Sequence, residues 1–526
     1  MAEPSRREDM APLAVAAIAL IALAPALLIG PIATDSGFYT YAWTRQLGES
    51  MARGEIYPRW LPDSFDGLGS PTFYFYPPLA FLVAGGLKAA GLPLALAVTG
   101  AATLFELASG LAMYAWLRPT TRWALAGAAL YMLAPFHLSE FYLRGDLAEF
   151  AAYAWFPLLA GSITRLPAPG AAAMLAASWA GLIMTSLPVA VLATLFLAAP
   201  LAVGKAIHDR RALLAGVAGA ALGLGLAAIY LLPALTLQRY VSFQVLRAIR
   251  PDWAFADLLA APAKLVPWFV AVPLAAILLA SRAPRPWLAA VVVAAVCATG
   301  AAPIWGAPIL RDVQFPWRLD AVLEFAAISC ACLWPPKRLI AALAAAAAIQ
   351  AYWATPLDMN VSADHFRAEG LNPLTATKEG AEYLPAGAET PRTGVDAPIT
   401  LPRAEGALAP TPVIRVARAG RLTLRRAAFP IWSVRRDGRA VPTSGPLITF
   451  EATPGLYELV RTTTPAELVG AAVSTLALVL TAGLALWGRW RRQPSIDAPL
   501  RAERLANVAH TDDGEVVLGD EALDEA

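Results

Sequence analysis

A short segment between two apolar stretches holds most of the residues that could do chemistry in this sequence. Its ionisable side chains are His137, Glu140, Arg144, Asp146 and Glu149. Ionisable groups this close to long apolar stretches are costly and by default mark a functional site, although mutual ion pairing would also explain them. Asp146 and Glu149 are three residues apart, so on a helix they would share a face. We favour a functional site over simple pairing.

Two further charged residues stand at the ends of apolar stretches. Asp35 directly follows the first stretch, where a membrane-bound substrate would reach its carboxylate; the structural alternative is a helix cap. Arg318, in the run Phe315-Pro316-Trp317-Arg318, suits phosphate because its planar guanidinium donates two hydrogen bonds to adjacent oxygens. The alternative is an arginine that extends from a helix end toward water. Glu106 and Glu324, inside apolar stretches, either face a cavity or pair internally.

Aromatic residues and prolines fill the segment that follows Asp35. It contains Tyr57-Pro58-Arg59-Trp60 and then residues 67–78, GLGSPTFYFYPP, which include Tyr74 and Tyr76. Aromatic side chains at the end of a membrane span normally form an interfacial belt. The functional alternative is a surface on which a sugar or a lipid stacks.

The composition indicates that membrane spans position these residues. The 526 residues are 58% apolar and 15% charged, against about 25% charged residues in soluble domains. A spanning helix needs about 20 mostly apolar residues, and we predict about twelve such spans, two of them within 166–204. They are residues 11–34, 94–117, 123–136, 150–164, 166–204, 212–238, 265–281, 286–302, 319–334, 339–357 and 468–488. The first exceeds the apolar core of a signal peptide, so we expect a retained anchor.

The positive residues predict how these spans are oriented. They cluster in short loops at residues 6–7, 118–122, 165, 205–211, 282–285, 337–338 and 489–492. The positive-inside rule places such loops, and with them both termini, in the cytoplasm. Residues 77–92 are apolar but contain Lys88, and a full crossing there would put Arg118 on the wrong side, so we predict an interfacial or re-entrant helix. The segments left outside, which can share one extracytoplasmic cavity, are 35–76, 138–148, 239–264 and 303–318.

The predicted fold class is therefore a mainly α, polytopic membrane protein with a small β-sandwich on the extracytoplasmic side. The expected parts are a cytoplasmic N-terminus (1–10), a transmembrane domain (11–357) with candidate catalytic outer loops 35–76 and 138–148, an extracytoplasmic region (358–465), a last span (466–488) and a disordered acidic cytoplasmic tail (489–526). Short β-like runs place the sandwich at 412–465. They are residues 413–417, 421–428, 431–435, 447–451 and 457–461, with turns at Asp437-Gly438 and Pro454-Gly455.

Several classes of function lack support in the sequence. Cys297, Cys330 and Cys332 all fall in predicted spans, so the outer region has neither a disulfide framework nor a cysteine zinc site. The net charge of +2 argues against a polyanionic partner such as nucleic acid. No internal repeat supports an inverted-repeat transporter.

This sequence combines an aspartate after span one, an aromatic first loop ending in Tyr-Pro-Pro and an acidic second outer loop. That combination resembles the GT-C superfamily of membrane glycosyltransferases. A bacterial group, labelled membrane proteins related to 6-pyruvoyl-tetrahydropterin synthase, is more similar. The motifs shared with it are Pro58-Arg59-Trp60, GLGSP at 67–71, Arg144-Gly145 with Glu149, and Phe315-Pro316-Trp317-Arg318. The run FPIWSV at 429–434, with Asp437-Gly438, resembles an outer β-domain of related proteins implicated in glycosylating cell-envelope polymers.

This likeness covers most of residues 10–490, with two qualifications. The pterin label does not transfer, because such an enzyme needs clustered histidines for zinc and the histidines here, at 137, 208, 365 and 510, are scattered. Asp146 stands where the group would have a small residue, which leaves open which acid of the second loop leads.

The resemblance implies transfer of a sugar from a polyprenyl-phosphate carrier to a glycan or lipid acceptor, with inversion, at the outer face of the bacterial inner membrane. Such chemistry needs a carboxylate to take the proton of the acceptor hydroxyl and a cation to stabilise the leaving phosphate. Asp35 would be the base, Glu149 and then Asp146 would position acceptor or base, and Arg144 and Arg318 would hold phosphate. Further candidate substrate-binding residues are Arg59, Tyr74, Tyr76, His137, Glu140 and Trp317. We expect no cofactor and no metal, although a carboxylate pair would suit a divalent ion.

Two other functions stay open. A non-catalytic protein that binds or moves lipid-linked glycans would use the same loops and the β-domain without turnover. An ion-coupled transporter would use Glu106, Glu324 and the outer acids as a proton path. The large extracytoplasmic content and the lack of repeats weigh against the transporter.

Overall fold

The computed structural model describes residues 10–30, 34, 36–242, 270–313, 315–347, 349, 380–386 and 406–490. Several predictions fall outside these residues. They concern Asp35, nearly all of the N-terminus, most of residues 358–411 in the extracytoplasmic region, most of the outer segment 239–264, and the tail from 491 onward. The described chain is mostly helical, with a small sheet region near its C-terminal end.

Five helices in the described ranges are long and apolar enough to cross a membrane. They are α2 (Ala11–Ile29), α7 (Leu94–Leu117), the continuous run Leu187–His208, α15 (Arg210–Leu237), and α23 (Pro465–Trp490). The run Leu187–His208 consists of α13 (Leu187–Ala193), η2 (Thr194–Ala198) and α14 (Ala199–His208). Each of these long helices lies where the sequence predicts a span, and Leu187–His208 is the second of the two predicted within 166–204. These helices indicate a membrane protein.

The helices in the other predicted spans are shorter than a membrane crossing needs, so the described structure does not confirm about twelve spans. These shorter helices are α8 (Ala124–Met132), α10 (Leu147–Ala152), α11 (Phe156–Thr164), α12 (Pro169–Thr185), α19 (Val272–Leu279), α20 (Arg285–Ala298), α21 (Asp320–Leu333) and the helix Arg338–Ala347. A proline explains one early end. Ala134 takes an extended conformation before Pro135, because a proline disfavours helical backbone at the residue that precedes it. The chain therefore ends α8 and restarts in α9 (Pro135–Ser139).

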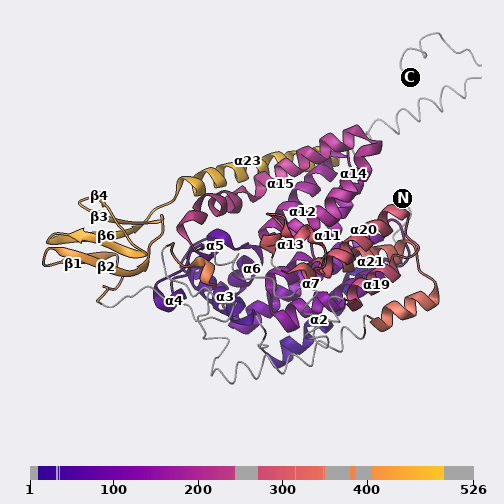
Figure 1. The fold of residues 1–526 in the computed structure, drawn as a ribbon, viewed down its shortest axis with the longest axis horizontal. Coiled ribbons are helices and arrows are strands. Elements are labelled where there is room, and N and C mark those ends of the chain that lie inside the picture. Colours follow the sequence, from indigo (N-terminus) through magenta and orange to yellow (C-terminus); the bar gives the residue numbers. More distant parts are fainter. Residues whose placement is uncertain are drawn as a thin grey trace, which may run out of the picture.

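The first outer segment is more helical than a loop. α3 (Gly37–Ala52) is a 16-residue helix, followed by the short helices α4 (Ser64–Gly67) and α5 (Thr72–Phe75). The apolar segment after it forms α6 (Leu79–Ala89), whose 11 residues are too few to cross a bilayer as one helix. Figure 1 shows this group of short helices at the end of the bundle nearest the strands.

Small residues let three long helices approach closely. In Figure 1, α15 and α23 run side by side, with α12 beneath them. A Cβ added to Gly470 would lie 2.7 Å from the carbonyl oxygen of Ala228, and one added to Gly219 would lie 2.9 Å from that of Ala172. Helices in membranes commonly pack through such small residues.

The C-terminal strands form two antiparallel sheets around one core. One sheet has the order β1 (Val413–Val416), β6 (Gly455–Arg461), β3 (Trp432–Arg436), β4 (Arg439–Val441), and the other pairs β2 (Gly420–Ala427) with β5 (Leu447–Ala452). Both sheets contribute buried side chains, among them Ile414, Leu424, Val434, Phe450 and Tyr457. All five predicted strands are confirmed, and the three-residue β4 is additional.

The β region rests on the first outer segment. The backbone N–H of Ala427 donates to the carbonyl of Leu68 at 2.8 Å, beside an aromatic contact between Trp60 and Trp432 with ring centroids 5.5 Å apart. Phe429 packs against Tyr74 at 5.1 Å. The strands are therefore joined to the helical part through the aromatic residues that the sequence singles out.

Candidate functional site

The candidate site is built on a turn between two short helices. The π-helical turn η1 (Glu140–Arg144) ends at Gly145, whose φ of 65° is the left-handed conformation that favours glycine. Asp146 then caps α10, because its Oδ1 accepts hydrogen bonds from the backbone N–H groups of Ala148 at 3.1 Å and Glu149 at 3.0 Å. The turn brings the charged side chains on both of its sides together.

Glu149 lies at the centre of a buried ion-pair cluster. Its Oε2 accepts from Arg144 Nη1 and its Oε1 from Arg318 Nε, each at 2.5 Å. Arg144 also donates to Glu140, and its Nη2 lies 3.7 Å from Asp146 Oδ2. We call Glu140, Arg144, Asp146, Glu149 and Arg318 the acid–arginine cluster. The side chains of Glu149, Arg318 and Arg144 are only 4%, 9% and 12% exposed, so water screens these pairs weakly.

Aromatic rings border the cluster. The guanidinium of Arg144 lies over the ring of Trp317 at 4.5 Å, and that of Arg318 lies over Phe315 at 4.8 Å. Both contacts are in the range of cation–π attraction. Burial raises the pKa of Tyr76 well above its ordinary value, and the charges of Asp146 and Glu149 raise it further, which places this tyrosine beside the same acids.

The three carboxyl groups of the cluster differ in protonation. Burial alone would raise the pKa of Glu149, but Arg144 and Arg318 hold it below its ordinary value. Burial raises the pKa of Glu140 well above its usual range despite the neighbouring Arg144, and it also raises that of Asp146. The two arginines therefore favour the charged form of Glu149, whereas burial favours the proton-bound forms of Glu140 and Asp146.

Asp35 itself lies outside the described residues, but its two chain neighbours contact the cluster turn. The backbone N–H of Ser36 donates to the carbonyl of Arg144 at 2.7 Å. A Cβ added to Gly145 would lie 1.9 Å from Oγ1 of Thr34, so the two segments touch. Thr40 fixes the same contact from α3 by donating to the carbonyl of Gly145 at 2.8 Å.

His137 belongs to a second polar group, deeper among the helices. Its Nε2 lies 3.3 Å from Oε2 of Glu106, and its ring stacks on Tyr153 with centroids 3.7 Å apart. Glu324 accepts from the backbone N–H groups of Phe136 and His137 and, at 2.8 Å, from the hydroxyl of Tyr153. Glu324 therefore pairs internally. Both carboxylate oxygens of Glu106 and Nε2 of His137 are buried without a hydrogen-bond partner among the described residues, so the question that the sequence left open for Glu106 stays open.

Asp320 is a member of this region that the sequence did not single out. It is fully buried, and it lies close enough to Glu140 and Glu324 for electrostatic interaction with both. Among the described residues, neither of its carboxylate oxygens has a hydrogen-bond partner. Its spacing of four from Glu324 on one helix was a usable signal, because residues four apart share a helix face.

Arg59 and Tyr74 lie at a third place, where the last helix meets the β region. Arg59 Nε is 3.7 Å from Glu467 Oε1, and the hydroxyl of Tyr74 donates to the same oxygen at 2.8 Å. Arg59 also donates to the carbonyl of Ile229 in α15 at 2.8 Å and lies over the ring of Tyr57 at 3.8 Å. These contacts join α15, α23 and the first outer segment.

The chemistry of the acid–arginine cluster must be argued from its own residues. No protein-family model, curated protein or solved structure matches this chain. Within the described ranges, no group of three or more histidine, cysteine or acidic residues is arranged to hold a metal ion. What the cluster offers is two arginines on one charged carboxylate, a second acid that favours its proton, and aromatic faces.

Proposed function

We propose that this protein is a GT-C-like membrane glycosyltransferase that moves a sugar from a polyprenyl-phosphate carrier to a glycan or lipid acceptor of the cell envelope, with inversion. The observation that carries the proposal is the buried pairing of Glu149 with Arg144 and Arg318 beside helices of membrane-spanning length. Two converging guanidinium groups suit a phosphate. Trp317, whose ring lies under Arg144, and Tyr76 add aromatic surface beside the phosphate site.

In the proposed reaction, the acceptor hydroxyl attacks the anomeric carbon and loses its proton to a carboxylate. The bond between that carbon and the phosphate oxygen breaks, and the phosphate leaves with the electron pair. Arg144 and Arg318 stabilise the charge that develops on the phosphate, which competes with Glu149 for them. Asp35 is the proposed base, since its neighbour Ser36 is hydrogen-bonded to the cluster turn. Before the donor binds, Glu149 holds both arginines in position.

The proposed setting is the bacterial inner membrane, with about twelve crossings and both termini in the cytoplasm. The five helices of spanning length support a membrane location. The basic loops support the orientation, which places the acid–arginine cluster and the β region on the outer side. The lipid-linked donor then reaches the cluster from within the membrane.

The experiment is sugar transfer from radiolabelled polyprenyl-phosphate sugars to envelope acceptors by the purified protein. Asp35→Asn is compared with Asp63→Asn, a matched change in the same outer segment at a half-exposed acid paired with Arg45. Loss of a general base lowers turnover by roughly 10²- to 10⁴-fold. We expect such a loss in Asp35→Asn with donor binding retained, and no loss in Asp63→Asn. Equal turnover of the two variants would remove Asp35 from the mechanism. A donor that binds but is never consumed by the wild type would instead favour a lipid-linked glycan carrier.

One observation favours a second candidate, an ion-coupled transporter. Glu106, His137 and Asp320 are fully buried, and in the described structure the carboxylate oxygens of Asp320 have no hydrogen-bond donor. Ionisable residues inside a membrane often mark a proton path. Proton flux into proteoliposomes that Asp320→Asn abolishes and Asp63→Asn does not would support transport, and absence of any flux in the wild type would exclude it.

A further inference from the structure

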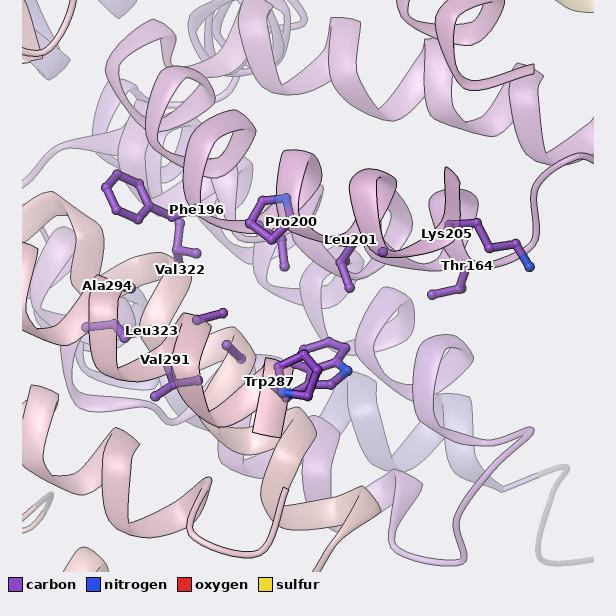
Figure 2. A pocket seen from close by; sticks show the side chains of 15 residues that line it. Thr164, Phe196, Pro200, Leu201, Lys205, Trp287, Val291, Ala294, Val322 and Leu323 are labelled. Carbon is purple, nitrogen blue, oxygen red and sulfur yellow. The ribbon is translucent and has the colours of Figure 1, made fainter. Parts of the chain in front are cut away.

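An apolar groove lies between α14 (Ala199–His208), α20 and α21, and none of its lining residues belongs to the acid–arginine cluster. Its cavity volume is about 350 Å³, at the small end of the range for ligand sites. Figure 2 shows Phe196, Val322 and Leu323 at one end and Trp287 on the wall that faces Leu201. Most of the lining residues have apolar side chains, so the groove suits a hydrocarbon chain.

The other end of the groove is basic. Lys205 and Thr164 lie there together (Figure 2). Arg165 and Arg285 directly adjoin the lining residues Thr164 and Pro286, and both are exposed. The acid nearest in sequence, Asp209, is occupied as the cap of α15, where its Oδ1 accepts from two backbone N–H groups. This end therefore carries a local excess of positive charge.

The exposed side chains of α14 indicate what surrounds the groove. Val203 and Ile207 are 58% and 73% exposed, and they lie in one of the helices long and apolar enough to cross a membrane. Large apolar side chains exposed on such a helix face lipid chains. The groove thus opens where phospholipids are the neighbouring molecules, with its basic end at the level of their headgroups by the positive-inside rule.

We propose that this groove is a binding site for a phospholipid with an anionic headgroup. One acyl chain lies along the apolar wall between α14 and α20, and the phosphate and headgroup pair with Lys205 and the two adjoining arginines. Basic pockets between membrane helices bind anionic lipid headgroups in this way. The site does not depend on the proposed transferase activity, because none of its residues belongs to the acid–arginine cluster.

The experiment is lipid binding to the delipidated full chain in detergent, measured by native mass spectrometry with phosphatidylglycerol and phosphatidylcholine of identical acyl chains. Lys205→Gln removes the charge at the groove, and Lys337→Gln makes the same change at an exposed lysine of another basic loop. A lysine near the headgroups is worth roughly a fivefold change in affinity. We expect Lys205→Gln to weaken the binding of phosphatidylglycerol about fivefold. It should weaken the binding of phosphatidylcholine less, because the choline cation offsets the charge of the phosphate. Lys337→Gln should change the affinity for neither lipid.

A second pair of variants tests the apolar part. Ala290→Phe fills the groove, whereas Ala289→Phe adds the same ring at the exposed neighbouring position of α20. Loss of binding of both lipids in Ala290→Phe, but not in Ala289→Phe, would support the acyl-chain site. The proposal is overturned if the wild type binds the two lipids with equal affinity. It is also overturned if Lys337→Gln lowers the affinity for phosphatidylglycerol as much as Lys205→Gln does, or if a folded Ala290→Phe protein binds both lipids with wild-type affinity.

Discussion

Exchanging Glu149 for glutamine leaves two buried arginines with an uncharged amide between them. The side chain of Glu149 is 4% exposed, and it accepts from Arg144 and Arg318 at 2.5 Å each. Breaking a buried ion pair by removing one partner costs about 3–5 kcal/mol, because an uncompensated charge remains. Glutamine still accepts one hydrogen bond, so we expect Glu149→Gln to lower the free energy of unfolding by about 3 kcal/mol, the lower end of that range.

The assay is equilibrium unfolding of the purified protein by sodium dodecyl sulfate in mixed micelles, followed by circular dichroism. The matched control is Glu49→Gln, which removes a charge paired with Arg45 at 3.5 Å on a side chain that is 43% exposed. Exposed pairs contribute about 0–1 kcal/mol, so this control should change the unfolding free energy little.

A double-mutant cycle separates the ion pair from any general damage. Arg318→Met alone also removes a hydrogen bond to the carbonyl of Val313, so only the coupling between Arg318→Met and Glu149→Gln reports the pair. We expect a coupling free energy of about 1–3 kcal/mol. Equal effects of Glu149→Gln and Glu49→Gln, or additive effects in the cycle, would refute the buried cluster as described.

Three other perturbations test separate parts of the structure. Gly145→Ala adds a methyl group against Thr34, so its thermal unfolding temperature should fall further than that of Gly91→Ala, which shares the positive φ but meets no atom within 4 Å; equal shifts would contradict the close contact. Burial raises the pKa of Glu140, so the folded protein keeps a proton on this side chain that the unfolded chain releases above about pH 4.3. The free energy of unfolding therefore falls as the pH rises from about 4.3 toward the raised pKa. In Glu140→Gln that slope should flatten in unfolding measured from pH 4.5 to 8, and an unchanged slope would assign it elsewhere. Phe429→Ala removes the ring that joins the β region to the first outer segment, so hydrogen exchange should rise in the strands before it rises in the long helices; uniform protection would argue against this joint.

The sequence predicted best what is encoded locally. Short β-like runs bounded by turn signals identified five strands, and the turn at Asp437-Gly438, with φ values of 51° and 76°, lies where predicted. The long helices were predicted equally well, because a mostly apolar stretch of spanning length rarely forms any structure other than a helix. α3 was missed because its mixture of polar and aromatic residues is also typical of an interfacial segment. Its burial depends on contact with α6 and α7, which local composition does not encode.

The candidate site shows the same limit. Residues Glu140 to Glu149 were grouped from the sequence because they are neighbours in the chain. Arg318 joins them across 169 residues, a contact that no local pattern specifies, although its position at the start of an apolar stretch made it a candidate. Arg59 and Tyr74 are charged and aromatic residues near apolar stretches, as the residues of the cluster are. In the structure they contact Glu467 in the last helix instead of the cluster.

The sequence left open whether Asp146 or Glu149 leads in the second outer loop, and backbone geometry separates them. The spacing of three residues places two side chains on one face only when both residues are helical. Asp146 has φ −87° and ψ 89°, so it stands before the helix, and its Oδ1 accepts from the N–H groups that begin α10. Glu149 is inside the helix, and both of its oxygens accept from guanidinium groups. A carboxylate committed to its own backbone has less freedom to exchange partners with a substrate than one held by side chains. The charge that a phosphate would displace is therefore that of Glu149, and Asp146 fixes the turn that presents it.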